Sequence, residues 1–444
     1  MTQSSPLPPS AVSTVPRAGS PTATTAPPAS TPDIPAPTAT SPKAKHRRST
    51  PQLLRLLSSG VILISLILGV VGALIFGYLA YSLDRAQADT DQLIRVQKIQ
   101  TNLLAADATA TNAFLVGGLE PPGQRAAYEQ AIDEAGALIA EAARAQPADG
   151  AALSALNDEV VRYASTVEQA RANNRQGLPV GAQYLRIASA DLRGVALPIL
   201  TNLVDANTRR ASAAMETQLP ALAFGVLGLL VLAGLILAMV WVARTFKRWI
   251  NPGLLAASTV VLVILIGAGI GLTTISGGVA ELQSGSFNRL TLVSRALIEA
   301  NNAKSNESLT LIARGSGTAF EQAWQASAEQ IETNLQQSGN PELAELWTGY
   351  AEVHSAIREL DDSGRWDQAV SRATGSGKDS ANVRFAAFDG PATEFVEEMA
   401  GLTQDGLAGP RIGLTIGAVL ILLAGIAAAL LGRRGVADRL REYR

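Results

Sequence analysis

Four long apolar segments constrain the fold of this chain more than any other feature. They cover residues 53–83, 219–243, 253–279 and 412–432. Each holds roughly the 20 apolar residues that cross the hydrocarbon core of a bilayer as a helix. From residue 56 onward these segments contain no Asp, Glu, Lys, Arg or His, whereas ion-coupled transporters place ionisable groups inside the membrane. The pattern predicts four transmembrane helices and counts against transport.

Basic residues beside the apolar segments predict their orientation. They gather before the first segment, in the loop 244–252 and in the tail 433–444. The positive-inside rule makes these regions cytoplasmic. Residues 84–218 and 280–411 are then extracytoplasmic, and both termini of this multi-pass protein of the cell membrane lie in the cytoplasm.

Residues 1–52 form a tail of mostly Pro, Ser, Thr and Ala. Such a segment buries too little apolar surface to offset the entropy of ordering, which predicts a disordered cytoplasmic tail. Two roles stay open, a plain linker and a segment for kinases or proline-binding domains. Its basic end, residues 43–48, is expected to rest on anionic lipid headgroups.

Both long segments between the apolar stretches have helical periodicity. The first predicts helices over 91–118, 125–146, 148–174 and 179–219, the last running into the second span with a kink at Pro198. The second predicts helices over 281–317, 318–337, 340–362 and 381–402, with a Gly/Ser-rich interruption at 363–380. Short connections between four helices favour antiparallel bundles, so the predicted fold is an all-α membrane protein with two four-helix-bundle domains.

The two bundles share local sequence. "AAYEQAIDEA" at 126–135 resembles "TAFEQAWQAS" at 318–327. Further along, the spacing from Leu156 to Tyr163 equals that from Leu343 to Tyr350. Two matches in the same order predict an internal repeat.

Polar runs on the first helix of each bundle predict a ligand or partner face. Its residues are Asp107, Thr109, Asn112, Asn302, Ser305 and Asn306. If they face inward, they can hydrogen-bond a small polar ligand or a partner loop; the alternative is a solvated helix face. Aromatic anchors of the second bundle are expected at Trp324, Trp347 and Trp366. Close packing of the spans is expected at small residues spaced by four, namely Gly69, Ala73, Gly77, Gly267, Gly271, Gly413 and Gly417; the alternative is the ordinary glycine content of membrane spans.

Catalytic chemistry has little support in the sequence. The chain has no cysteine and two histidines, His46 and His354, so thiolate sites and paired imidazoles are excluded. It lacks phosphate-loop, kinase, zinc-protease and serine-hydrolase motifs. We expect no enzyme activity, no cofactor and no bound metal. A net charge of −2 gives no case for nucleic acid.

The regions placed in the cytoplasm are too short to form an output domain, which predicts a separate soluble partner. Candidate contacts for it are Arg244, Lys247, Arg248, Trp249, Arg439, Arg441 and Tyr443. These residues can equally serve as positive-inside anchors.

Two resemblances add to this picture. The bundles are similar to the four-helix ligand-binding domains of chemoreceptors. The Pro/Thr-rich tail, four spans, two helical domains and the ending "RLREYR" together resemble the actinobacterial GlnX membrane proteins. That resemblance implies a relay of aspartate and glutamate availability from a substrate-binding lipoprotein outside to a soluble Ser/Thr kinase inside. We therefore expect a non-enzymatic transmembrane signal transducer; the alternatives are a membrane component of a transport system and a structural cell-envelope protein.

Overall fold

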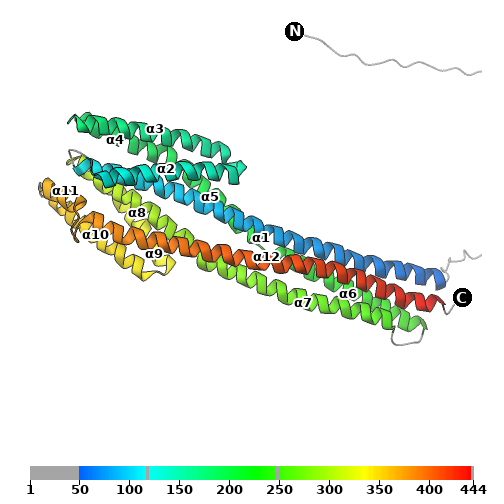
Figure 1. The fold of residues 1–444 in the computed structure, drawn as a ribbon. Coiled ribbons are helices and arrows are strands. Elements are labelled where there is room, and N and C mark those ends of the chain that lie inside the picture. The colour runs from blue at the N-terminus through cyan, green and yellow to red at the C-terminus, as the bar shows by residue number, and fades with distance from the viewer. Residues whose placement is uncertain (1–49, 117–119, 247–250, 442–444) are drawn as a thin grey trace, which may run out of the picture. The chain divides into compact units, whose positions relative to one another are not determined.

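The computed structural model describes residues 50–116, 120–246 and 251–441, and across these residues the chain is helical with no strand (Figure 1). The prediction of an all-α membrane protein is confirmed. The predicted disordered tail lies outside the described residues up to residue 49.

Helix α1, Thr50–Val116, joins the first predicted span and the first bundle helix in one run of 67 residues. No proline or glycine interrupts the junction between them. Beyond the span, apolar residues at helical spacing turn one face inward, and Leu93, Val96 and Leu103 are fully buried. The same rigid helix therefore reaches from one end of the span to the tip of the first bundle.

Bundle 1, residues 84–218, is completed by the helices that follow α1. They are α2 (Pro122–Ala145), α3 (Gly150–Arg175), α4 (Val180–Asp191), a π-helical turn (Leu192–Ala196) and α5 (Leu197–Ala214). The irregularity expected at Pro198 is this π turn, which directly precedes the proline. The predicted continuous helix into the second span is wrong. Helix α5 ends at Ala214, and α6 (Gln218–Phe246) starts anew with Pro220 in its first turn.

Bundle 2, residues 280–411, begins with helices that continue the third span. The elements are α7 (Pro252–Leu282), a π turn (Gln283–Phe287), α8 (Asn288–Ile312), α9 (Thr318–Ser338), α10 (Pro341–Asp362), α11 (Trp366–Thr374) and α12 (Ala381–Arg441). Helix α11 lies within the predicted Gly/Ser-rich interruption. It forms because Ala369 and Ala373, one turn apart, are buried against the bundle.

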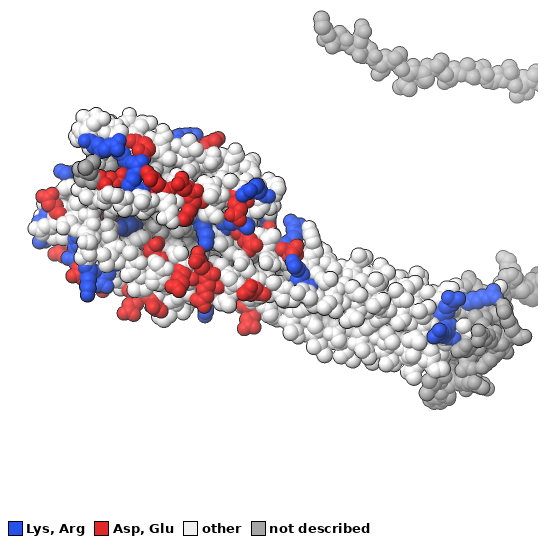
Figure 2. Space-filling view, viewed as in Figure 1, with Lys and Arg blue, Asp and Glu red and all other residues white. Residues whose placement is uncertain are grey.

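Four helices of the described chain are long and apolar enough to cross a membrane. Their large apolar side chains face outward, and Leu74 and Ile270 are 66% and 64% exposed. Charged side chains gather over the bundles, while the spans present an uncharged surface (Figure 2). Such a surface suits lipid tails rather than water.

Small residues bring only some of the spans close together. The backbone of Gly69 in α1 lies directly against Gly425 in α12. Gly417 contacts the Phe76 ring. Four of the other predicted positions are wrong as packing sites within the described chain, because a side chain added at Gly77, Gly267, Gly271 or Gly413 would meet open space.

Aromatic residues form much of the core of bundle 2, as predicted. Trp347 and Tyr350 are almost fully buried, and the Trp347 ring packs edge-on against Phe388. Trp324 stacks on Trp347. Trp366 is partly buried and donates its indole N–H to the carbonyl of Leu311 at 2.9 Å.

Candidate functional site

The two bundles meet through their first helices, α1 and α8 (Figure 1). Helix α8 is packed by α9, α11 and α12 of its own bundle and by α1 of the other. Its residues from Ala303 to Leu311 are all buried. The solvated face considered as an alternative for this polar run is wrong, because a second bundle covers it.

Asp107 in α1 is the centre of the contact between the bundles. Its carboxylate is fully buried and accepts hydrogen bonds from Ser305 Oγ of α8 and Ser189 Oγ of α4, both at 2.5 Å. Tyr163 of α3 donates at 3.2 Å, and Arg193 Nη1 in the π turn lies 2.9 Å away. A buried carboxylate is tolerated where charge and hydrogen bonds compensate it, and here the compensation requires both bundles.

Arg193 extends this network into bundle 2. Its Nε donates to Asn302 Oδ1 of α8 at 3.0 Å. The Asn302 amide in turn donates to Ser327 Oγ of α9 at 3.1 Å, and Asn306 lies within 3.4 Å of the Asn302 oxygen. Four of the predicted residues, Asp107, Asn302, Ser305 and Asn306, are therefore brought into one network.

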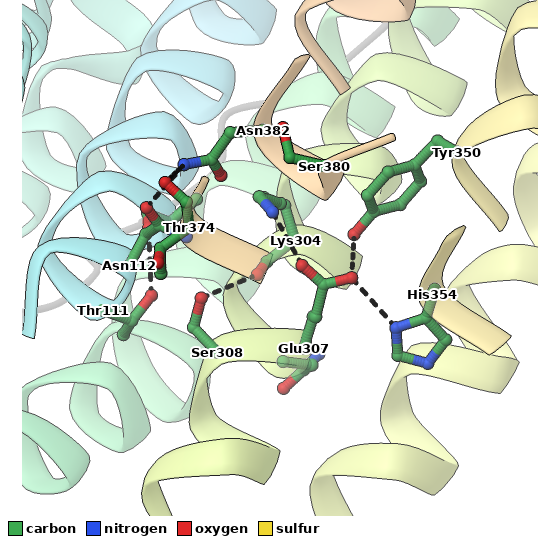
Figure 3. Close-up of polar contacts among 12 residues, drawn as sticks. Thr111, Asn112, Lys304, Glu307, Ser308, Tyr350, His354, Thr374, Ser380 and Asn382 are labelled. Atoms are coloured by element: carbon green, nitrogen blue, oxygen red, sulfur yellow. Dashed lines mark hydrogen bonds and ion pairs between the residues drawn. The ribbon is translucent and has the colours of Figure 1, made fainter. Parts of the chain in front are cut away.

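Asn112 forms a second contact between the bundles, one turn beyond Asp107. Its Oδ1 accepts from Gln124 of α2 at 3.0 Å. It also accepts from Asn382 of α12 at 3.0 Å (Figure 3). Its Nδ2 is buried without a partner among the described residues. Thr109, the remaining predicted residue, is half-buried and lines a cavity of about 280 Å³ together with Asn112.

A buried charge cluster in bundle 2 was missed by the sequence analysis. Glu307 of α8 accepts from Tyr350 at 3.2 Å and lies 2.6 Å from Lys304 Nζ and 3.0 Å from His354 Nδ1 (Figure 3). The other ring nitrogen of His354 lies 3.3 Å from Glu321. Two of its residues, Tyr350 and Glu321, lie in the sequence matches between the bundles, but nothing in the sequence marked them as one cluster.

Opposing effects set the pKa values in this cluster. Burial alone would raise the pKa of Glu307, but Lys304 and His354 lower it to about 2. Burial alone would lower the pKa of His354, but the contacts with Glu307 and Glu321 raise it above its ordinary value. Glu307 is thus held ionised, and a proton on His354 is favoured.

Comparison with known protein families bears on bundle 1. Residues 82–216 match the family model described as actinobacterial sensor domain. The match covers bundle 1, including Asp107 and three of the four side chains that compensate it. It supports an actinobacterial sensor protein with a sensing and signalling role. Neither the curated proteins nor the solved structures contain a match.

Bundle 1 and bundle 2 share one arrangement of polar side chains. In each, a buried carboxylate on the first helix accepts a hydrogen bond from a tyrosine on the third, Asp107 from Tyr163 and Glu307 from Tyr350. Burial and the adjacent carboxylate raise the pKa of both tyrosines well above the ordinary value, so both stay neutral donors. These are the tyrosines of the sequence match; the internal repeat itself stays a prediction.

The opposite end of the spans holds the predicted cytoplasmic contacts. Arg244 is exposed near the end of α6. Lys247, Arg248, Trp249 and Tyr443 lie outside the described residues, as do the side chains of Arg439 and Arg441. The sequence analysis missed Asn251, which caps α7 and donates from Nδ2 to the carbonyl of Gly435 in α12 at 2.8 Å. This bond joins two spans at the end away from the sensor domain.

Proposed function

We propose that this protein is a transmembrane signal transducer. It reports extracytoplasmic amino-acid availability, received through a substrate-binding lipoprotein, to a soluble cytoplasmic Ser/Thr kinase. In this proposal the two bundles lie outside the membrane and both termini lie in the cytoplasm, as the flanking basic residues favour.

The observation that carries the proposal is the contact between Asp107 and Ser305. Asp107 lies on the same uninterrupted helix as the first span. Ser305 lies on α8, which continues the third span through one π turn. A change that separates the two side chains therefore acts on two spans at once, and packed helices respond by small sliding or tilting movements.

The output end supports the same mechanism. The bond from Asn251 to Gly435 ties α7 to α12, and Cα atoms of Gly253 and Gly435 also lie close together. A relative movement of the spans changes this junction and the surface around the exposed Arg244 near the end of α6. A soluble partner that binds this surface reads the change as a difference in affinity.

The nutrient, the lipoprotein and the kinase are inferred from the resemblance to GlnX proteins together with the sensor-domain match. The regions that the flanking basic residues place in the cytoplasm are short, so in this proposal the enzymatic response comes from another protein.

Kinase output in living cells tests the proposal. We compare phosphorylation of Ser/Thr-kinase substrates after glutamate is supplied to starved cells of the source organism, with the wild-type gene, a deletion, or Ser305→Ala. The response should vanish in the deletion and shrink at least twofold in Ser305→Ala. Ser355→Ala is the matched control, because its exposed hydroxyl bonds only its own helix. An unchanged response in the deletion strain would refute the proposal in favour of a transport or envelope role.

A further inference from the structure

A groove between the bundles has the composition of a ligand site. It encloses about 490 Å³, within the range of small-molecule sites. Helices α1 and α2 form one wall, and α8 and α12 form the other. At Ala105 and Asp389 it adjoins the 280 Å³ cavity beside Asn112.

Buried polar groups without partners line this groove. Gln97 of α1 and Ser294 of α8 are each 3% exposed. Neither the amide nitrogen and oxygen of Gln97 nor the hydroxyl of Ser294 has a hydrogen-bond partner among the described residues. Leaving such groups unpaired costs free energy, so a ligand that pairs with them gains affinity.

The charged residues that line the groove favour a positively charged ligand. Asp389 accepts a hydrogen bond from the neutral amide of Asn301 at 3.3 Å, and no ion pair to it is formed by the described residues. Among the residues that the structure describes, Glu134 accepts only from the amides of Asn102 and Gln130. The one lysine on the wall, Lys98, is already paired with Glu397 at 2.9 Å.

We infer that the groove binds a small organic cation that carries an ammonium group on an aliphatic chain. The ammonium of the ligand pairs with Asp389, and any other polar atoms of the ligand pair with Gln97 and Ser294. Its aliphatic chain packs against Leu138, Leu297 and other apolar residues of the wall. A metal ion fits less well, because the described residues hold no group of three or more metal-binding side chains.

The state of Asp389 agrees with this assignment. Burial raises its pKa, against the opposing effect of the Asn301 hydrogen bond. The carboxylate is therefore less stable ionised in the groove than in water, and a bound ammonium restores the ionised form. Binding should accordingly weaken at acid pH as Asp389 takes up a proton.

The inference goes beyond the proposed function, and binding can be measured without any partner or output. Full-length protein in nanodiscs is titrated with pentylamine, and pentanol and pentanoate serve as neutral and anionic probes of the same chain length. Ligand-observed NMR reports binding relative to empty nanodiscs. We expect pentylamine to bind at least fivefold more tightly than either probe.

Two variants locate the site. Asp389→Asn should abolish the preference for pentylamine, whereas Asp205→Asn, which changes an acid in a separate cavity lined by α5, α8 and α9, should retain it. Ala137→Trp blocks the groove from an exposed position and should remove binding even if Asp389→Asn does not fold. Equal binding of pentylamine and pentanol, stronger binding of pentanoate, or no binding at all would overturn the assignment. In that case, the kinase response to glutamate would still test the proposed signal relay independently.

Discussion

The hydroxyl of Ser305 donates a 2.5 Å hydrogen bond to the carboxylate of Asp107, from the first helix of one bundle to the first helix of the other. The two residues are far apart in the sequence but lie together where the bundles meet. Without this contact, each bundle would expose a row of polar side chains to solvent. The contact joins the two bundles, so its loss should lower the stability of the protein and weaken the coupling between the bundles and the spans.

Removal of this bond should destabilise the protein measurably. A hydrogen bond to a charged group contributes about 1.5–3 kcal/mol, so Ser305→Ala should lower the free energy of unfolding in detergent by about that amount. In a double-mutant cycle with Asp107→Asn, the coupling energy should reach about 1–2 kcal/mol. Additive effects of the two substitutions would contradict a direct interaction.

Stability should depend on pH through the cluster in bundle 2. Because the pKa of His354 is raised above 6.5 in the fold, its stabilising proton is present below that value and is lost as the pH rises through the folded pKa. Because the pKa of Glu307 is lowered from 4.5 to about 2, its contribution is present above 4.5 and is lost as the pH falls toward 2.

Thermal unfolding at a series of pH values measures this dependence. His354→Gln should remove the alkaline loss, while His46→Gln, in the N-terminal tail, should leave it unchanged. The ring of His354 stacks on Trp324 at 3.7 Å, so the tryptophan fluorescence should change over the same alkaline range. A wild-type curve that is flat above pH 6.5 would contradict the role of His354.

The packing of the bundles can be fixed chemically. Lys98 of α1 and Glu397 of α12 are exposed and 2.9 Å apart, which suits an amide cross-link formed by a carbodiimide. Mass spectrometry should find this cross-link in the wild type and not in Glu397→Gln. Its absence from the wild type, with other carboxylates activated, would show that the bundles do not pack in this way.

Close approach of the first and fourth spans should be sensitive to side-chain size. A Cβ at Gly425 would lie 2.5 Å from the Gly69 Cα, so Gly425→Leu should cost about 1–3 kcal/mol by overpacking. Gly413→Leu is the control, since the same change meets open space in the same helix. Equal melting temperatures for the two variants would exclude this helix contact.

The sequence predicted the helices well because hydrophobic periodicity and uncharged length are local signals. It gave no basis for deciding between the two alternatives for the polar run around Ser305. That decision depends on α1 covering α8, which is a contact between distant segments. The same reason explains why the sequence analysis did not predict Asp389, Gln97 and Glu307. Nothing in the sequence around them marks these residues as buried.

The sequence analysis did not predict the break after α5 or the helix α11, for a different reason. Each depends on a few residues at a junction, where packing outweighs local propensity. By contrast, Asp107 and Asn112 could be singled out, because they belong to a polar run on the first helix of the bundle.

The central claim, that the contact between the bundles controls the far ends of the spans, is tested most directly by a distance measurement. The chain has no cysteine, so spin labels on Arg244→Cys and Arg434→Cys report one distance, by pulsed electron resonance in nanodiscs. We predict that Ser305→Ala shifts or broadens this distance distribution and that Ser355→Ala does not. Identical distributions in all three proteins would contradict the claim.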